Sequence, residues 1–166
     1  MSRIVSFIAR AAWPFCLVYG LYVIIHGHLT PGGGFQGGAV MATGAALMMV
    51  SGAWDAAGRE RHEHRAAVFE TLGLVGFVAV AFGGLLFGAA FFHNWLANTG
   101  CSFFGLPVEP GPNPGVLRTA GTLPLMNLAV GIEVFGGISV ILCALQKAFH
   151  DADGDETPSE ESPDDD

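Results

Sequence analysis

The chain is expected to turn at His26-Gly27-His28-Leu29-Thr30-Pro31-Gly32-Gly33-Gly34-Phe35-Gln36-Gly37-Gly38, between two long apolar segments. This position predicts a turn at the face of a membrane. Irregular backbone is not tolerated in contact with hydrocarbon, so the turn must be covered by protein or by water. Its glycines permit positive φ angles and the close approach of other backbones, and Pro31 ends the helix before it. We therefore expect tight packing of the two helices that flank the turn.

Four apolar segments are long enough to span a bilayer, which takes about 20 residues each. They are residues 4–25, 35–53, 67–92 and 122–145. Hydrophobic residues make up 51% of the chain and charged residues 13%, and the mean hydropathy is +0.49. These values are typical of membrane proteins. The sequence therefore predicts an all-α membrane protein with four transmembrane helices, in which the first segment, too long for a signal-peptide core, is retained.

The formal net charge of −8 is concentrated at one end of the chain. The last sixteen residues hold nine acidic side chains, and the rest of the chain holds seven basic and six acidic ones. Acidic tails of this kind are usually disordered and solvated. We expect a transmembrane domain over residues 1–149 and a disordered cytoplasmic tail over residues 150–166, and the charge gives no reason to expect nucleic acid as a partner.

Lysine and arginine predict the orientation of the spans. With four spans, both termini and the second loop share one side, which carries six basic residues against one on the other side. The six are Arg3, Arg10, Arg59, Arg61, Arg65 and Lys147, and the one is Arg118. The positive-inside rule then places both termini in the cytoplasm and the glycine turn outside.

Small residues suggest how the helices associate, because membrane helices pack where glycines let backbones touch. The spacing GxxxG occurs at Gly33/Gly37 and Gly34/Gly38 in the second segment, and at Gly84/Gly88 in the third. Four thin helices bury little between themselves, so we expect helices from partner chains. The loop over residues 93–121 is too long for a simple connector, and its prolines and aromatics predict an ordered cap or a docking surface. His93 and Trp95 fit an interfacial aromatic belt.

Two carboxylates lie within the predicted spans. We place Glu70 about one turn inside the third helix, where it reaches the headgroups and has a structural role. Glu133 falls near the middle of the fourth helix, where an ionised carboxylate costs at least ~3 kcal/mol. Ala129, Gly136 and Gly137 share its face, so we expect Glu133 to point into protein. It is then protonated, paired with a cation, or part of a cation or proton route; the alternative is a hydrogen bond between helices.

The remaining polar residues carry weaker signals. His26 and His28 lack the spacing and the third ligand of a metal site, and His62 and His64 lie in a mixed-charge loop that we interpret as solvated. Cys16 and Cys143 are expected to be inert hydrophobes. The sequence contains no nucleophile with a base, no phosphate-binding loop and no dinucleotide fingerprint. We therefore expect neither an enzyme acting alone nor a cofactor.

Residues 28–38 and 123–134 resemble two marked segments of a known family. The first is similar to the GH-x-x-PGGGF-x-GG signature of the B subunit of Mrp-type multisubunit sodium/proton antiporters, the MnhB family. The second, Leu-Pro-Leu-Met-Asn-Leu-Ala-Val-Gly-Ile-Glu-Val, resembles the family's segment in the last helix. The resemblance covers residues 4–147. Carried over from it are the outer turn (His28, Pro31, Gly32, Gly33, Gly34, Phe35, Gly37 and Gly38) and, in the last helix, Asn127 and Glu133.

The resemblance implies a small accessory subunit of a complex in the prokaryotic cell membrane that exchanges sodium ions for protons. Its expected partners are the large antiporter-like A and D subunits, the small C, E, F and G subunits, and the bilayer. Candidates for the ion path are Glu133, Asn127 and Glu70. Related subunits also occur in membrane-bound hydrogenases and other relatives of complex I, and a purely structural scaffold is a third alternative.

The glycine turn itself has two interpretations. Backbone carbonyls freed by glycines can coordinate a cation, as they do in channel filters. The N–H groups at the start of the second helix would repel a cation. We therefore take helix packing as the default role of the turn.

Overall fold

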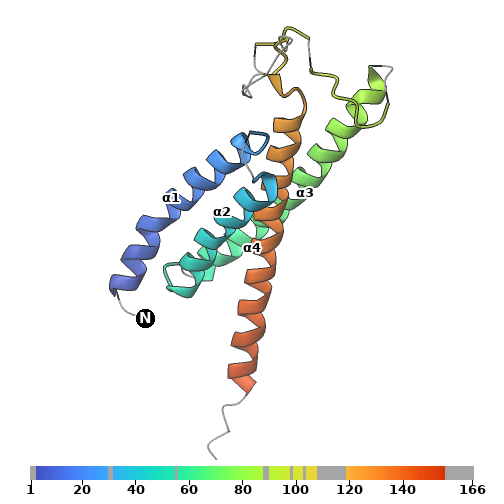
Figure 1. Cartoon of the computed structure of the whole chain (residues 1–166). Helices are drawn as coiled ribbons and strands as arrows, with labels where there is room; N and C mark the ends of the chain where they lie inside the picture. The colour runs from blue at the N-terminus through green and yellow to red at the C-terminus, as the bar shows by residue number, and fades with distance from the viewer. Residues whose placement is uncertain are drawn as a thin grey trace, which may run out of the picture.

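The computed structural model describes residues 3–29, 32–54, 56–87, 90–97, 99–102, 104–107 and 119–155; the side chains of residues 56, 57, 59 and 150–155 lie outside this description. Figure 1 shows four α-helices in these residues, which are α1 (Arg3–His26), α2 (Gly34–Val50), α3 (Ala56–Leu86) and α4 (Leu123–Asp155). The described part of the chain contains no strand. The predicted all-α fold class is confirmed.

Three of the four helices are long and apolar enough to cross a membrane. The apolar stretches are Arg3–His26, Glu60–Leu86 and Leu123–Phe149. α2 is apolar but has only 17 residues. A helix of that length is about 25 Å long, against ~30 Å for the hydrocarbon core. The helices support a multi-pass membrane protein in which α2 depends on its neighbours to cover its ends.

The predicted second loop is wrong in its extent. α3 already begins at Ala56, so residues 59–65, expected in a solvated loop, form its first turns. Alanine, arginine and glutamate favour helix, and Lys147 Nζ lies 2.6 Å from the Glu63 carboxylate, which ties this part of α3 to α4. Glu70 therefore lies about four turns into α3 instead of one.

The ends of the last two helices also differ from the prediction. α3 ends at Leu86, short of residue 92. α4 continues to Asp155, well past residue 145 and past the boundary expected at residue 150. The acidic tail beyond it, residues 156–166, lies outside the described residues.

The helices lie side by side in the order α1, α2, α4, α3 (Figure 1). α2 packs against both α1 and α4, and α3 packs chiefly against α4. Glycines make these crossings close: a Cβ added to Gly20 of α1 would lie 2.6 Å from the Gly37 carbonyl oxygen of α2. A Cβ added to Gly38 would lie 2.6 Å from the Gly131 carbonyl oxygen of α4. Glycine pairs thus set both contacts of α2.

The chain buries little of its own apolar surface. The most apolar windows of the three long helices are only 17%, 22% and 33% buried, in chain order. Large side chains are exposed along α1, α3 and α4, with Phe7, Phe15 and Phe149 at 74%, 75% and 70%. This surface must be covered by lipid or by other protein chains, because contiguous apolar surface is not left open to water.

The described part of the loop after α3 folds back onto the helix ends. Trp95 Nε1 donates to the Val80 carbonyl oxygen at 3.3 Å, and the ring lies over Gly83 and stacks on Phe87 at 5.1 Å. Asn94 Oδ1 accepts the Thr122 backbone N–H at 2.7 Å, at the start of α4. Trp95 is thus an internal anchor between loop and helix, which goes beyond the predicted interfacial belt, and this part of the loop forms an ordered cap.

Candidate functional site

The glycine turn joins α1 to α2 with little irregular backbone. Among its described residues only Gly32 has a positive φ, at 146°. Gly33 is the N-cap of α2 with an extended backbone, φ −177°, and its carbonyl oxygen accepts the Gly37 N–H at 3.1 Å. A Cβ on Gly33 would have ordinary contacts at 3.5 Å or more. Gly33 therefore has no positive φ and has room for a Cβ of its own, although its Cα lies 2.5 Å from the place of a Cβ on Gly27.

The glycines that follow Gly33 make the close contacts with neighbouring helices. A Cβ on Gly34 would come within 2.8 Å of Val130 Cβ and 3.0 Å of the Gly131 nitrogen. Gly37, one turn on, faces α1 and lies on the Gly20 carbonyl oxygen and Ile24. The predicted Gly34/Gly38 pair thus packs on α4. Gly33 and Gly37 do not act as a pair, because Gly37 packs on α1 and Gly33 has room.

Two other residues of the turn occupy different surroundings, and one cannot be placed. Phe35 is 60% exposed and points away from the bundle. His26 stacks on Tyr22, with ring centroids 4.2 Å apart. Pro31 lies outside the described residues, as does Gly88 of the predicted Gly84/Gly88 pair. Gly84 itself packs against His93 of the loop and not against a helix.

Asn127 connects the turn to α4. Its Oδ1 would lie 3.5 Å from a Cβ on Gly33, and its Nδ2 would lie 3.0 Å from a Cβ on Gly27. The side chain therefore sits between the end of α1 and the start of α2. The resemblance had associated Asn127 with the site, and the structure brings it against the glycine turn.

His28 is one of two titratable groups of the turn, beside His26. Both ring nitrogens are buried, and neither has a hydrogen-bond partner among the described residues. Burial lowers the pKa of His28 from its usual value of 6.5, and neighbouring His26 lowers it further, while the Ile25 backbone opposes the shift. His28 is therefore held in its neutral form at pH 7.

Glu133 lies on the seam where α3 and α4 cross. A Cβ on Gly73 of α3 would lie 2.5 Å from the Glu133 nitrogen and 2.6 Å from its Cβ. Ala129 also faces Gly73, and Gly136 faces Ala66 and Glu70. The predicted small-residue face around Glu133 does meet another helix, and Glu133 is half-buried there.

Glu70 borders the same seam one turn further along α4. Its side chain is exposed, and its Oε1 would lie 3.7 Å from a Cβ on Gly137. Within the described residues, neither Glu70 nor Glu133 forms an ion pair. The two carboxylates therefore occupy successive levels of one helix contact.

Polar groups recur along α4, first on its side toward the glycine turn and then along its contact with α3. Asn127 lies at the turn, Glu133 and then Glu70 follow, and Lys147 pairs with Glu63 at the far end. From residue 127 to residue 147 the helix rises about 30 Å, which matches the hydrocarbon thickness of a bilayer. Among the described residues no three His, Cys, Asp or Glu side chains gather as a metal site would require.

The sequence alone did not reveal three of the glycines at the helix crossings. Gly20, Gly73 and Gly131 each stand in a helix interior and each face a backbone of another helix. An isolated helical glycine is costly unless something uses the space, and that signal was present. The sequence alone also did not reveal a basic pocket between α1 and α3, because half of the pocket was assigned to a loop.

Known proteins that are similar to this chain support a family assignment. A family model described as a domain related to the MnhB subunit of Na⁺/H⁺ antiporters matches residues 4–140. The chain is 30% identical over 139 residues to the uncharacterized protein MJ1307 of Methanocaldococcus jannaschii, covering 83% of this chain and 50% of that protein.

A solved structure is also similar. It is that of the membrane-bound sulfane sulfur reductase, an archaeal respiratory membrane complex, in which the matching chain is 33% identical with a TM-score of 0.62. The match covers 87% of this chain and 58% of that one, so the chain spans only about half the length of the relatives it matches. With a family model matched over most of its length, and with the glycine turn and the Glu133 helix inside the match, the chain belongs to the MnhB family.

Proposed function

We propose that this chain is an integral-membrane subunit of a multisubunit sodium/proton antiporter complex in a prokaryotic cell membrane, and that its α3–α4 seam helps to line the ion pathway. On this proposal the chain carries out no chemical reaction of its own. Its part is to hold polar groups at fixed depths between helices while neighbouring chains complete the passage.

The position of Glu133 carries the proposal. It is half-buried against the backbone of α3, near the middle of the longest apolar window of α4. An ionisable group at that depth is costly and is by default functional. Asn127 lies on the same helix toward the glycine turn, and Glu70 of α3 lies beside the next turn of α4. The chain also belongs to a family described by its relation to an antiporter subunit.

The exposed helices support the multisubunit part of the proposal. Most of the apolar windows of α1, α3 and α4 are left uncovered by the chain itself. Gly-rich contacts are already used between its own helices, so bulky exposed side chains remain for partners and lipid. We propose the A and D antiporter-like subunits and the small C, E, F and G subunits as those partners.

Affinity purification of the full chain from its native membrane tests the proposal. The co-purifying chains should include large antiporter-like subunits, and the purified assembly should move protons in response to sodium after reconstitution. Recovery of the chain with no other membrane subunit would contradict the proposal.

A redox complex is the second candidate, favoured by the structural similarity to a chain of the sulfane sulfur reductase complex. In that case the same helices would serve in a membrane arm attached to an electron-transfer module. The same purification separates the two candidates: chains that carry iron–sulfur clusters would identify a redox complex, and their absence beside antiporter-like chains would identify an antiporter.

A further inference from the structure

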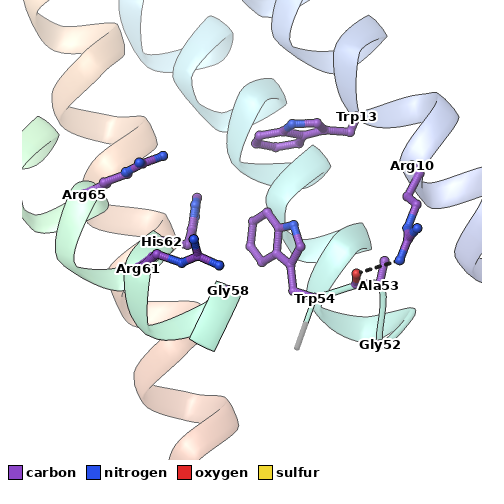
Figure 2. Close-up of a pocket in the computed structure, with 9 residues that line it drawn as sticks. All are labelled: Arg10, Trp13, Gly52, Ala53, Trp54, Gly58, Arg61, His62 and Arg65. Atoms are coloured by element: carbon purple, nitrogen blue, oxygen red, sulfur yellow. Dashed lines mark hydrogen bonds between the residues drawn. The ribbon is translucent and has the colours of Figure 1, made fainter. Parts of the chain in front are cut away.

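A polar pocket of about 750 Å³ opens at the end of the bundle that carries the basic residues. It is formed by α1, the α2–α3 linker and the first turns of α3 (Figure 2). The side chains that define it are Arg10, Trp13, Trp54, Arg61, His62 and Arg65. Neither the antiporter proposal nor the family assigns a role to this pocket.

The charge of the pocket is positive. Three arginines line it, and no acidic side chain of the described residues does so. Of the acidic residues described in these turns, Glu63 is engaged by Lys147 at 2.6 Å and Glu60 is exposed and does not line the pocket. The adjacent Asp55 and Arg59 have side chains outside the description and carry opposite charges. Guanidinium groups match the geometry of phosphate oxygens and bind them with two hydrogen bonds.

The pocket is already organised for a ligand. Arg10 is held by a 3.1 Å hydrogen bond from its Nη2 to the Ala53 carbonyl oxygen. Trp54 packs on His62 at 4.4 Å between ring centroids, and Trp13 meets Trp54 edge to face at 6.0 Å (Figure 2). His62 Nε2 is buried and has no hydrogen-bond partner among the described residues. A polar atom in that condition is costly unless a ligand or water satisfies it.

The surroundings of the pocket are those of a membrane interface. Arg10 lies in α1 and Arg65 in the first turns of the span Glu60–Leu86. Tryptophans mark the level of the headgroups in membrane proteins, and basic pockets between transmembrane helices bind anionic headgroups. The pocket therefore sits where a lipid phosphate would be found.

Apolar surface continues from the pocket along α3. Phe69 and Leu72 follow Arg65 at i+4 and i+7, so all three share one face of the helix. Phe69 is 42% exposed and Leu72 58% exposed. A phosphate at Arg65 would thus have room for acyl chains directly beside it, which a free anion would not use.

We propose that this pocket binds the phosphodiester headgroup of an anionic phospholipid, with the acyl chains lying along α3. The arginines supply the positive charge, and His62 supplies a hydrogen-bonding nitrogen. The two tryptophans lie at the depth of the lipid's glycerol backbone.

Native mass spectrometry tests the site on the full chain with the partners that co-purify, after delipidation in detergent. The preparation is titrated with phosphatidylglycerol or with phosphatidylcholine of the same acyl chains. We expect the wild type to bind one phosphatidylglycerol tightly. The variant that combines Arg61→Gln and Arg65→Gln should bind this lipid about 25-fold more weakly, because the loss of each arginine lowers the affinity about fivefold. Millimolar inorganic phosphate should not displace this lipid.

Two matched variants keep the test informative. Arg3→Gln removes an exposed arginine of the same end of α1 that does not line the pocket, and it should leave the affinity unchanged. Arg65→Lys keeps the charge but loses the paired hydrogen bonds, so it should bind more weakly than the wild type and more tightly than the double variant. Equal binding of the two lipids, or an equal loss in Arg3→Gln, would overturn the proposal. So would displacement by inorganic phosphate, or a gain in lipid affinity when residues 156–166 are removed, which would assign the pocket to the acidic tail.

Discussion

At the scale of single residues, the two carboxylates of the α3–α4 seam lie in different surroundings. Glu133 is half-buried with its backbone against Gly73, whereas the Glu70 side chain is exposed beside Gly137. A carboxylate in low dielectric must be neutralised by a proton or a cation. On the proposed function, Glu133 is the residue whose charge matters most for transport, and Glu70 is a matched carboxylate on the same seam.

Replacing Glu133 tests this assignment. Glu133→Gln should leave the complex intact but reduce antiport by tenfold or more, because the amide keeps the shape and cannot take up a proton. Glu133→Asp should retain partial activity, and Glu70→Gln should have a smaller effect than Glu133→Gln. Sodium-driven proton movement in everted vesicles is the measurement, with abundance of the complex checked by blotting. Full activity of Glu133→Gln would remove this residue from the mechanism.

His28 gives the turn a dependence on pH. Because burial lowers its pKa below 6.5, the folded chain resists protonation and the unfolded chain does not. The stability that neutral His28 supports is present above pH 6.5 and is lost as the pH falls from there through the folded pKa. The melting temperature of the purified complex should therefore fall more between pH 7.5 and pH 5.5 than it does for His28→Gln. His64→Gln, which changes an exposed histidine, is the control. An equal pH dependence in the wild type and His28→Gln would contradict the assignment.

At the scale of elements, α2 is a short apolar helix held on two sides by glycine contacts. Gly37 meets α1, and Gly34 and Gly38 meet α4. Close backbone approach gains dispersion contacts that bulky residues would prevent. Because α2 is too short to span the membrane comfortably, these contacts are what fix it in place.

Two adjacent glycines make a sharp test of that packing. A Cβ on Gly34 would meet Val130 at 2.8 Å, whereas one on Gly33 would meet nothing closer than 3.5 Å. Gly34→Ala should destabilise the assembly by about 1–3 kcal/mol through overpacking. Gly33→Ala should cost less, about 0.5–1 kcal/mol, because alanine is a poorer N-cap than glycine but its Cβ meets no close contact. Yields of assembled complex from matched membranes give the comparison, and equal yields for both variants would show that close packing does not hold α2.

How much of this could be read from the sequence differs by element. The apolar runs of α1, α2 and α4 were long enough to identify each helix, and the glycine turn between the first two was evident from composition. The first turns of α3 were not, because their residues are polar and the contact of Glu63 with Lys147 is remote in sequence. The same applies to the candidate site. Glu133 could be recognised from its position near the middle of an apolar segment, but its contact with Gly73 could be identified only from the fold.

At the scale of the whole molecule, the basic residues gather at one end of the helix row. Arg10, Arg61 and Arg65 share one pocket, and Lys147 of α4 pairs with α3 at the same end. The glycine turn lies at the opposite end of α1 and α2 (Figure 1). The helices leave most of their apolar windows exposed, and lipid or other membrane chains must cover this surface.

The clustering of the basic residues allows the orientation to be predicted. By the positive-inside rule both termini face the cytoplasm. A reporter active only outside the cytoplasm should be silent when fused after Asp166 and active when inserted near Asn113. The reverse pattern would invert every assignment of sides.

Membership of a sodium/proton antiporter complex is tested most directly by the transport activity that depends on this chain. Everted vesicles are prepared from a strain lacking the chain, from the same strain carrying the full wild-type chain, and from one carrying Glu133→Gln. We expect sodium-driven proton movement to be absent in the first, restored in the second, and reduced by tenfold or more in the third. Sodium-driven proton movement that is undiminished in vesicles lacking the chain would contradict the proposed function.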